Sequence, residues 1–325
     1  MTTTKREIGD SGIEVTPLAF GGNVFGWTVD EPTSFRLLDA FADRGFDLID
    51  TADVYSRWVP GHQGGESETI IGNWLARTGK RSRAVIATKV GMEMAPDKKG
   101  LSRSYILRAA EDSLKRLRTD YIDLYQSHQD DAATPLDETL RAYQDLIKQG
   151  KVRAVGASNY TASRLSEALS VSEREGLPRY VSLQPLYNLY DREDYEAQLE
   201  EVCREYNLGV FPYFSLASGF LTGKYRSLSD TDGKARGTRA AKYLNERGFE
   251  ILKALDTVAA ENHSTPAKVA IAWLLAKPTV TAPIASATNL SQLEDLFDAV
   301  DLQLDEDSIN VLDQASAWRL EAASA

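Results

Sequence analysis

Four side chains in the first half of the chain have the types that a proton-transfer site needs: Asp50, Tyr55, Lys89 and His128. A free tyrosine has a pKa of about 10, so Tyr55 would donate a proton at neutral pH only if its phenolate were stabilised, as a nearby lysine ammonium would do. A carboxylate beside that lysine would keep it charged and oriented, and a neutral histidine would hydrogen-bond the reacting oxygen. The set therefore predicts proton transfer to or from a carbonyl or alcohol oxygen.

The same set contains no obvious nucleophile and no source of electrons, so a reduction would need hydride from a cofactor. Two alternatives stay open at this point. Lys89 could form an imine with a carbonyl substrate, as in a Schiff-base aldolase. The residues could also be structural, with Asp50 as a helix cap or salt-bridge partner, Tyr55 as a rim residue and His128 as a core histidine.

The spacing of these residues favours chemistry over a structural role. Six successive apolar runs end in a polar residue, in the order Asp50, Lys89, His128, Ser158, Gln184 and Tyr213. The first two intervals are 39 residues each, and the next three are 30, 26 and 29. One strand-plus-helix unit occupies about that length, so we expect all six side chains at the same end of successive parallel strands.

The elements that would position them form an α/β pattern. Short β-branched or aromatic runs occur eight times, as VTPLAF, FDLID, AVIATK, IDLYQSH, VRAVGAS, YVSLQP, LGVFPYF and VTAPIAS. Amphipathic, helix-patterned stretches lie between them, at 102–117, 136–148, 163–175 and 195–206. The alternation predicts a single domain, 1–325, built as a (β/α)8 TIM barrel with its chemistry at the carboxyl ends of the strands. An open doubly wound sheet is the alternative, and the run GGNVFG at 21–26 lacks the GxGxxG spacing that it would need.

Three further segments have predicted places in this barrel. The run KREIGDSGIEV predicts an N-terminal β-hairpin, with its turn at 10–12, that caps the barrel floor. A polar, basic connection at 222–247 and a glycine-containing loop at 56–66 are long, and long connections of this kind are typically functional.

Composition excludes several classes of function. A formal net charge of −11 argues against a general binder of nucleic acid or of anionic membranes. The N-terminus MTTTKREIG has no apolar core of a signal peptide, and no apolar stretch approaches the roughly 20 residues that span a bilayer, so we expect a cytoplasmic protein. One cysteine, Cys203, and three histidines without HxH or HExxH spacing predict neither a disulfide nor a metal site.

Taken together, several motifs resemble one known family. They are GFDLIDTADVY, IATKVG, TDYIDLYQSH, KVRAVGASNY, SLQPLYN and FLTGKY. Over essentially its whole length the chain is similar to the aldo-keto reductases. It resembles a bacterial-type member of that family. The resemblance implies an NAD(P)H-dependent oxidoreductase that interconverts an aldehyde or ketone with its alcohol by hydride transfer. It makes Tyr55 the general acid/base, Lys89 and Asp50 the pair that tunes it, and His128 the residue that orients the substrate oxygen.

The resemblance also implies a nicotinamide site. Ser158, Asn159 and Gln184 would hydrogen-bond the carboxamide, and Tyr213 would stack on the ring, in keeping with the donors, acceptors and aromatic face such a group needs. Without the family match, GASNY is equally a strand-to-helix turn with a polar cap.

The run SLASGFLTGKY at 215–225 resembles the pyrophosphate loop of the family, whose expected contacts here are Phe214, Ser215, Leu216, Ser218, Gly219, Leu221 and Lys224. Related loops often read tyrosine, serine, proline, leucine, whereas this chain reads Tyr-Phe-Ser-Leu.

The adenosine end departs most from the family pattern. The expected contacts are Ser286, Thr288, Gln292 and Asp295. Relatives that prefer NADP commonly carry lysine or arginine at the positions matching the first three, to meet the 2′-phosphate, and none of the three is basic here. Hydroxyls and an amide can still bond a phosphate, but without charge assistance. NADP(H) is favoured on the family pattern, and NAD(H) or dual use stays open.

We expect a small-molecule carbonyl or alcohol substrate. Phe25, Trp27 and Trp58 are the candidate walls of its pocket, although each could instead pack under a loop. The chain stops shortly after a predicted helix at 305–317, so we expect a comparatively open pocket. A remaining alternative is a redox-sensing regulatory subunit, because some members of the family associate with potassium channels; this sequence has no distinctive extension for such a partner. The sequence makes no prediction of an oligomeric state.

Overall fold

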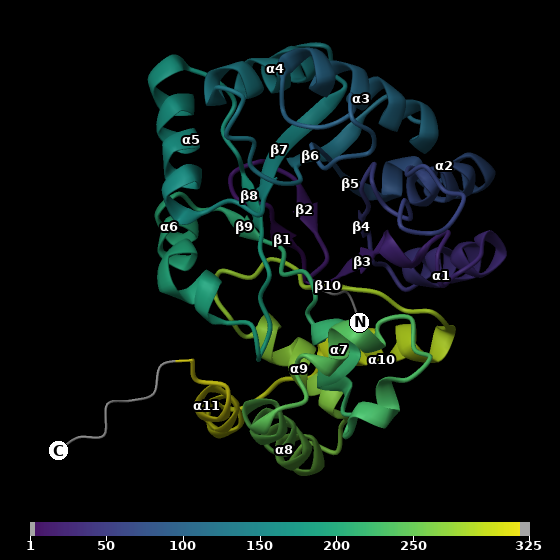
Figure 1. The fold of residues 1–325 in the computed structure, drawn as a ribbon, viewed down its shortest axis with the longest axis vertical. Helices are drawn as coiled ribbons and strands as arrows, with labels where there is room; N and C mark the ends of the chain where they lie inside the picture. Colours follow the sequence, from purple (N-terminus) through teal and green to yellow (C-terminus); the bar gives the residue numbers. More distant parts are fainter. Residues whose placement is uncertain (1–3, 319–325) are drawn as a thin grey trace.

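The computed structural model describes residues 4–318, and its centre is a ring of eight parallel strands (Figure 1). Along the ring these are β10 (Ile284–Ala285), β3 (Ala19–Gly21), β4 (Leu48–Asp50), β5 (Val85–Val90), β6 (Ile122–Ser127), β7 (Val152–Ser158), β8 (Ser182–Gln184) and β9 (Gly209–Val210). Backbone bonds from Ile284 N to Pro212 O (2.9 Å) and from Thr281 N to Val210 O (2.9 Å) join the two ends of this order. The sheet is therefore closed, and the predicted (β/α)8 barrel is confirmed.

Helices cover the outside of the ring. Those after β3 to β8 are α1 (Glu31–Asp43), α2 (Glu66–Thr78), α3 (Arg103–Leu117), α4 (Leu136–Lys148), α5 (Ala162–Glu175) and α6 (Glu200–Glu205). Those after β9 and β10 are α7 (Gly237–Ala241), α8 (Glu246–Glu261), α9 (Pro266–Leu275), α10 (Leu290–Asp301) and α11 (Glu306–Ala315). The predicted helix at 195–206 is divided, because a π-helical turn at Tyr195–Leu199 precedes α6.

Local sequence explains where several helices begin. The Asp30 carboxylate accepts a hydrogen bond from Thr33 N at 2.9 Å, and Thr161, Asn245, Thr265, Asn289 and Asp305 cap α5, α8, α9, α10 and α11 in the same way. Such caps satisfy amide groups that have no partner inside the helix. The apolar face of each helix then packs against the strands, and the largest buried cluster lies between these two layers.

A second, smaller apolar cluster fills the inside of the barrel. Its members from the strands are small or branched, among them Ala19, Leu48, Ala87 and Leu124. The hairpin of β1 (Arg6–Glu7) and β2 (Glu14–Val15) contributes Ile8, Ile13 and Val15 to the same cluster. The hairpin lies across the centre of the ring in Figure 1, so it caps the barrel floor as predicted.

The polar residues picked out by their spacing lie at the carboxyl ends of the strands. Asp50, Ser158 and Gln184 are the last residues of β4, β7 and β8, Lys89 is next to last in β5, and His128 directly follows β6. The connection at 222–247 is more ordered than its sequence indicated, because it contains a short 3-10 helix at Leu228–Thr231, α7 and the start of α8.

Between residues 4 and 318, no helix combines the length and apolar character needed to cross a membrane. The same part of the chain holds no group of three or more histidine, cysteine, aspartate or glutamate side chains placed to bind a metal ion.

Candidate active site

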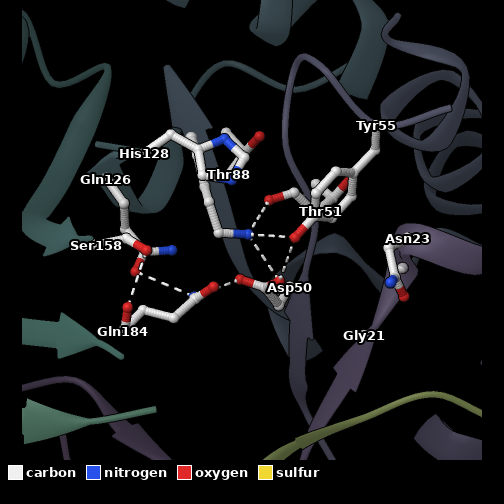
Figure 2. Close-up of polar contacts among 12 residues, drawn as sticks. Gly21, Asn23, Asp50, Thr51, Tyr55, Thr88, Gln126, His128, Ser158 and Gln184 are labelled. Atoms are coloured by element: carbon white, nitrogen blue, oxygen red, sulfur yellow. Dashed lines mark hydrogen bonds and ion pairs between the residues drawn. The ribbon is translucent and has the colours of Figure 1, made fainter. Parts of the chain in front are cut away.

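A buried lysine is the centre of the site. The Lys89 ammonium donates to Asp50 Oδ2 at 2.7 Å, to the Thr51 carbonyl at 2.7 Å and to the Tyr55 hydroxyl at 3.0 Å (Figure 2). An ammonium has three N–H groups, so these three acceptors use all of them. The Lys89 side chain is 0% exposed, and Asp50 is buried beside it. A carboxylate, a carbonyl and a phenol therefore fix both the charge and the direction of the lysine.

Tyr55 is held next to this lysine by the turn that follows β4. The turn closes with a backbone bond from Tyr55 N to Ala52 O at 3.3 Å. The next residue, Ser56, has a left-handed φ of 71°, and its hydroxyl donates to the Phe25 carbonyl at 2.7 Å. The Tyr55 hydroxyl also lies 3.4 Å from Asp50 Oδ2, to which it can donate. The phenol thus contacts both members of the ion pair.

His128 lies across from the phenol, with 6.0 Å between the centres of the two rings. Its backbone N donates to Val90 O at 2.8 Å, which continues the pairing of β5 with β6. Its Nδ1 is buried without a hydrogen-bond partner among the described residues. Burial, and then the positive charge of Lys89, hold the pKa of the imidazole well below its usual 6.5. The ring is therefore neutral at physiological pH and can hydrogen-bond a reacting oxygen.

Burial is also the largest cause of the pKa shifts of Tyr55 and Lys89. It raises the pKa of Tyr55 well above 10, and the negative charge of Asp50 acts in the same direction. The positive charge of Arg236 opposes this rise. Burial also lowers the pKa of Lys89, against the opposing effect of Asp50. Tyr55 consequently keeps its proton at neutral pH, the state that a proton donor requires.

The residues expected to hold a carboxamide form one connected group. Ser158 Oγ donates to the Gln184 carbonyl at 2.9 Å, and the Asn159 amide donates to the His128 carbonyl at 2.8 Å. The Tyr213 hydroxyl donates to Asn159 Oδ1 at 2.8 Å. The Gln184 amide donates to Asp50 Oδ1 at 2.9 Å, which links this group to the ion pair (Figure 2).

Sequence reasoning missed Gln126, which belongs to the same group. The Gln184 amide lies 3.3 Å from Gln126 Oε1, and Gln126 Nε2 is buried without a partner among residues 4–318. Its position was open to prediction, because side chains alternate along a strand and Gln126 precedes His128 by two residues in the run IDLYQSH.

The loop after β9 has the backbone shape of an anion cradle. Phe214, Ala217, Ser218 and Gly219 have left-handed φ values of 53°, 46°, 58° and 93° around the helical turn at Ala217–Thr222. A side chain at Gly219 would place its Cβ 3.1 Å from the Lys224 ammonium, so the glycine leaves room for a close approach. Below the loop, the hydroxyl of the buried Ser215 donates to Ile284 O at 2.8 Å. Leu216 and Leu221 pack against the core from the same loop.

Positive charge gathers around this cradle. The side chains of Lys224, Lys234, Arg236 and Arg239 form no hydrogen bond or ion pair with any residue that the structure describes. Burial, Arg236 and Lys234 lower the pKa of Lys224, so the cations are close enough to repel one another. Unpaired cations beside left-handed backbone fit a pyrophosphate, and the residues present therefore fit a dinucleotide.

The residues expected at the adenosine end offer hydroxyl and amide groups, and the described residues place no unpaired cation among them. Ser286 Oγ donates to Gly21 O at 2.7 Å, and the Thr288 hydroxyl and amide contact the Gln292 side chain, at 3.1 and 2.9 Å. Asp295 is paired with Lys268 at 3.1 Å. Lys268 also holds Asp298 at 2.7 Å, so its charge is already compensated.

Two of the three candidate pocket walls lie at the mouth of the barrel. The rings of Trp27 and Trp58 are 5.6 Å apart and nearly perpendicular, and the ring of Trp58 lies 6.1 Å from that of Tyr55. Phe25 lies deeper than expected. It is fully buried and its ring stacks on Phe20 at 5.2 Å, so the structure places it in the core beneath the wall.

Fold and site together define a (β/α)8-barrel protein with a buried lysine–aspartate pair, a tyrosine and a histidine at the carboxyl ends of its strands. Residues 17–317 match the model of the Aldo/keto reductase family. The chain therefore belongs to this family, as its motifs predicted, and the protein is an oxidoreductase of the class that acts on small-molecule carbonyl compounds.

Individual relatives agree with this assignment. The chain is 36% identical over 312 residues to the uncharacterized oxidoreductase YrpG of Bacillus subtilis, an alignment that covers 94% of this chain and 93% of the relative. It is 34% identical over 323 residues to the protein tas of Escherichia coli, with 91% and 93% covered. It is also 33% identical over 305 residues to a probable voltage-gated potassium channel subunit beta of Arabidopsis thaliana, with 91% of each chain covered.

Proposed function

We propose that the protein interconverts an aldehyde or ketone with its alcohol, using NAD(P)H, with Tyr55 as the general acid/base. The observation that carries this proposal is the contact of a single buried lysine with both Asp50 and the Tyr55 hydroxyl. Such a group moves protons, and it lies beside residues that fit a dinucleotide.

The side chains divide the work as follows. His128, which is neutral, donates a hydrogen bond that positions the carbonyl oxygen of the substrate. Tyr55 gives its proton to that oxygen in reduction and takes it back in alcohol oxidation. Lys89 stabilises the phenolate that remains, and Asp50 keeps Lys89 in place. When bound, the reduced nicotinamide supplies the hydride that the carbonyl carbon accepts.

NADP(H) is the cofactor we propose, with NAD(H) or dual use as the alternative. Ser158, Asn159 and Gln184 would hold the carboxamide and Tyr213 the ring, and the cradle around Gly219 would take the pyrophosphate. The cations around the cradle support a dinucleotide of either kind. The preference for the 2′-phosphate rests on hydroxyl and amide groups at Ser286, Thr288 and Gln292, so we expect a modest ratio between the two cofactors.

The test follows the absorbance of the reduced nicotinamide with 4-nitrobenzaldehyde as substrate, with NADPH and NADH in parallel. We expect turnover by the wild type and a loss of roughly a hundredfold or more in kcat for Tyr55→Phe, since the phenylalanine has no proton to give. Tyr206→Phe is the matched control, because Tyr206 follows the last residue of α6 and belongs to none of the strand ends that form the site. Retention of full activity by Tyr55→Phe would exclude the proposed role.

The structure argues against an aldolase. A lysine that forms an imine must be deprotonated and free to reach the substrate. Lys89 is fully buried and gives all three of its N–H groups to protein acceptors. Borohydride in the presence of an aldehyde should therefore leave Lys89 unmodified, as mass spectrometry of its peptide would show.

A second candidate function is a redox-sensing regulatory subunit, which the similarity to a probable potassium channel subunit of Arabidopsis thaliana favours. It predicts slow turnover, a cofactor retained through gel filtration and recovery of a membrane protein with the tagged chain. Fast turnover with freely exchanging cofactor would favour the enzyme.

A further inference from the structure

A buried asparagine, Asn188, joins the loop after β8 to the loop after β9. Its side chain is 0% exposed. Its Oδ1 accepts from the backbone N of Tyr190 at 2.8 Å and from that of Asp191 at 2.9 Å. Its amide donates to Asp191 Oδ2 at 3.0 Å and, across the two loops, to the Phe214 carbonyl at 3.1 Å. These four bonds use both the donors and the acceptor of the side chain, so Asn188 fixes its own loop in a turn and attaches the next loop to it.

The attachment falls on the residue next to Tyr213. Phe214 has a left-handed φ of 53°, a conformation that a bulky residue keeps only when its surroundings support it. One residue earlier, Tyr213 N donates to the Pro185 carbonyl at 2.9 Å. The backbone from Tyr213 N to the Phe214 carbonyl is therefore bonded at both ends to the loop after β8. The direction of the Tyr213 ring depends on that loop.

Asp191 connects these two loops to a third segment. The hydroxyl of Tyr243, which lies between α7 and α8, donates to Asp191 Oδ2 at 2.7 Å. Tyr243 is fully buried, and its ring stacks on that of Phe220 in the helical turn at Ala217–Thr222, with 5.4 Å between the ring centres. A single carboxylate oxygen thus accepts from both Asn188 and Tyr243. It fixes three segments at the mouth of the barrel relative to one another.

We propose that Asn188 and Asp191 are positioning residues for the nicotinamide ring, and that they act through the backbone that carries Tyr213. An aromatic face stabilises a bound ring only when the two rings meet at a suitable distance and angle. Without the Asp191 carboxylate, the Asn188 amide and the Tyr243 hydroxyl would lose the acceptor that they share, and the Tyr213 ring would lose its fixed direction. This inference rests on the proposed nicotinamide-dependent function and names residues that prepare its cofactor site.

The test compares two ligands that differ in the nicotinamide group. NADP+ carries this group, whereas 2′-phospho-ADP-ribose has the same adenosine, phosphates and ribose without it, and NAD+ with ADP-ribose forms a second pair. Calorimetry on the full-length protein gives the Kd of each ligand, and the Kd of the ADP-ribose compound divided by that of the dinucleotide isolates the nicotinamide contact.

We expect Asp191→Ala to lower this ratio roughly tenfold, because the stacking contact is lost. Asp191→Asn keeps a carbonyl oxygen as acceptor and should restore part of the ratio. Tyr243→Phe removes one of the two donors and should lower the ratio by a smaller factor. Glu193→Ala, at an exposed position of the same loop, should leave the ratio unchanged.

A double substitution shows whether Asp191 acts through Tyr213. Tyr213→Ala removes the aromatic face, so adding Asp191→Ala to it should lower the ratio no further. Additive effects would overturn the inference, because Asp191 would then influence binding by another route. Thermal unfolding shows which variants are folded. If Asp191→Ala is not, Tyr243→Phe, which removes one hydroxyl, gives the decision, and a wild-type ratio in that variant contradicts the inference.

These outcomes are separate from those of the reductase function. Turnover of 4-nitrobenzaldehyde by the wild type tests that function, whereas the Kd values require no turnover. If the wild type binds both compounds of a pair equally, the inference is wrong, because the nicotinamide then contributes nothing to binding. If the wild type binds none of the four compounds, both the inference and the proposed cofactor are wrong.

Discussion

Tyr55 and His128 are both uncharged at neutral pH, and burial is the largest cause of the pKa shift that favours the uncharged form of each. In the proposed mechanism a protonated phenol and a neutral imidazole contact the same oxygen atom of the substrate, and they have different roles there. In the proposed mechanism the phenol gives the proton, because Lys89 stabilises the phenolate that it leaves. The neutral imidazole can still orient the oxygen through its N–H.

The direction of these pKa shifts predicts the pH profile of reduction. A histidine whose pKa lies well below 6.5 gains a proton only in more acidic solution, and a tyrosine whose pKa lies well above 10 loses its proton only in more basic solution. We therefore expect kcat/KM for 4-nitrobenzaldehyde to be nearly flat from about pH 6 to about pH 9. A limb near pH 6.5 in the wild type that is missing in His128→Gln would show that His128 titrates normally.

Asp53 is a buried carboxyl that the proposed reaction does not use. Both of its oxygens are buried without a hydrogen-bond partner in the described part of the chain. Burial raises its pKa well above 3.8, and the charge of Glu68 adds to the effect. Between 3.8 and that raised pKa, the folded state binds a proton that the unfolded state has lost. Stability from this group is therefore fully present below about pH 3.8 and falls as the pH rises.

Asp53→Asn should remove this pH dependence. Because the amide does not ionise, we expect the Tm of the variant to increase relative to that of the wild type as the pH is raised from about 5 to about 8. Thermal unfolding followed by circular dichroism measures the difference. Asp120→Asn, at an exposed position after α3, should show no such trend. A difference between wild type and Asp53→Asn that does not vary with pH would mean that Asp53 is ionised throughout.

At the scale of elements, strands were predictable from the sequence and the long connections were not. Asp50, Lys89 and His128 could be placed because each ends an apolar run at a regular interval, and a parallel barrel brings such ends together. Arg236 lies in a polar segment without periodicity, so only tertiary packing shows that it turns toward Trp27. The direction of the Tyr55 pKa shift could not be predicted for a related reason, because burial depends on residues distant in the sequence.

The loop after β9 can be tested at one position. Gly219 has a φ of 93°, which disfavours any residue with a Cβ, and an alanine Cβ would lie 3.1 Å from the Lys224 ammonium. We expect Gly219→Ala to raise the Kd for NADPH roughly tenfold while the protein stays folded, as fluorescence titration and thermal unfolding would show. Gly176→Ala is the control, since it also has a positive φ, of 62°, but ends α5 with open space around it. Equal NADPH affinities in the two variants would exclude a cradle at Gly219.

On the scale of the whole molecule, the two ends of the barrel have separate tasks. The mouth carries the buried ion pair, the aromatic wall and the unpaired cations. The floor is closed by the hairpin, whose Ile8, Ile13 and Val15 complete the inner apolar cluster. Arg6 anchors the hairpin by donating to Val280 O at 2.7 Å. The inner cluster lies between floor and mouth, so a substitution at the floor should lower the stability of the protein and leave kcat nearly unchanged.

Ile13→Ala tests this separation. Ile13 is 3% exposed, and removing a buried isoleucine side chain of this kind destabilises a protein by about 2–5 kcal/mol, because it loses apolar contacts and leaves a cavity. Thermal unfolding should therefore show a clearly lower Tm, whereas kcat well below that temperature should stay near the wild-type value. Glu14→Ala, on the neighbouring exposed position of β2, should change neither. If Ile13→Ala lost kcat while still folded, the floor would be coupled to the mouth through the inner cluster, and the two ends could not be treated as independent.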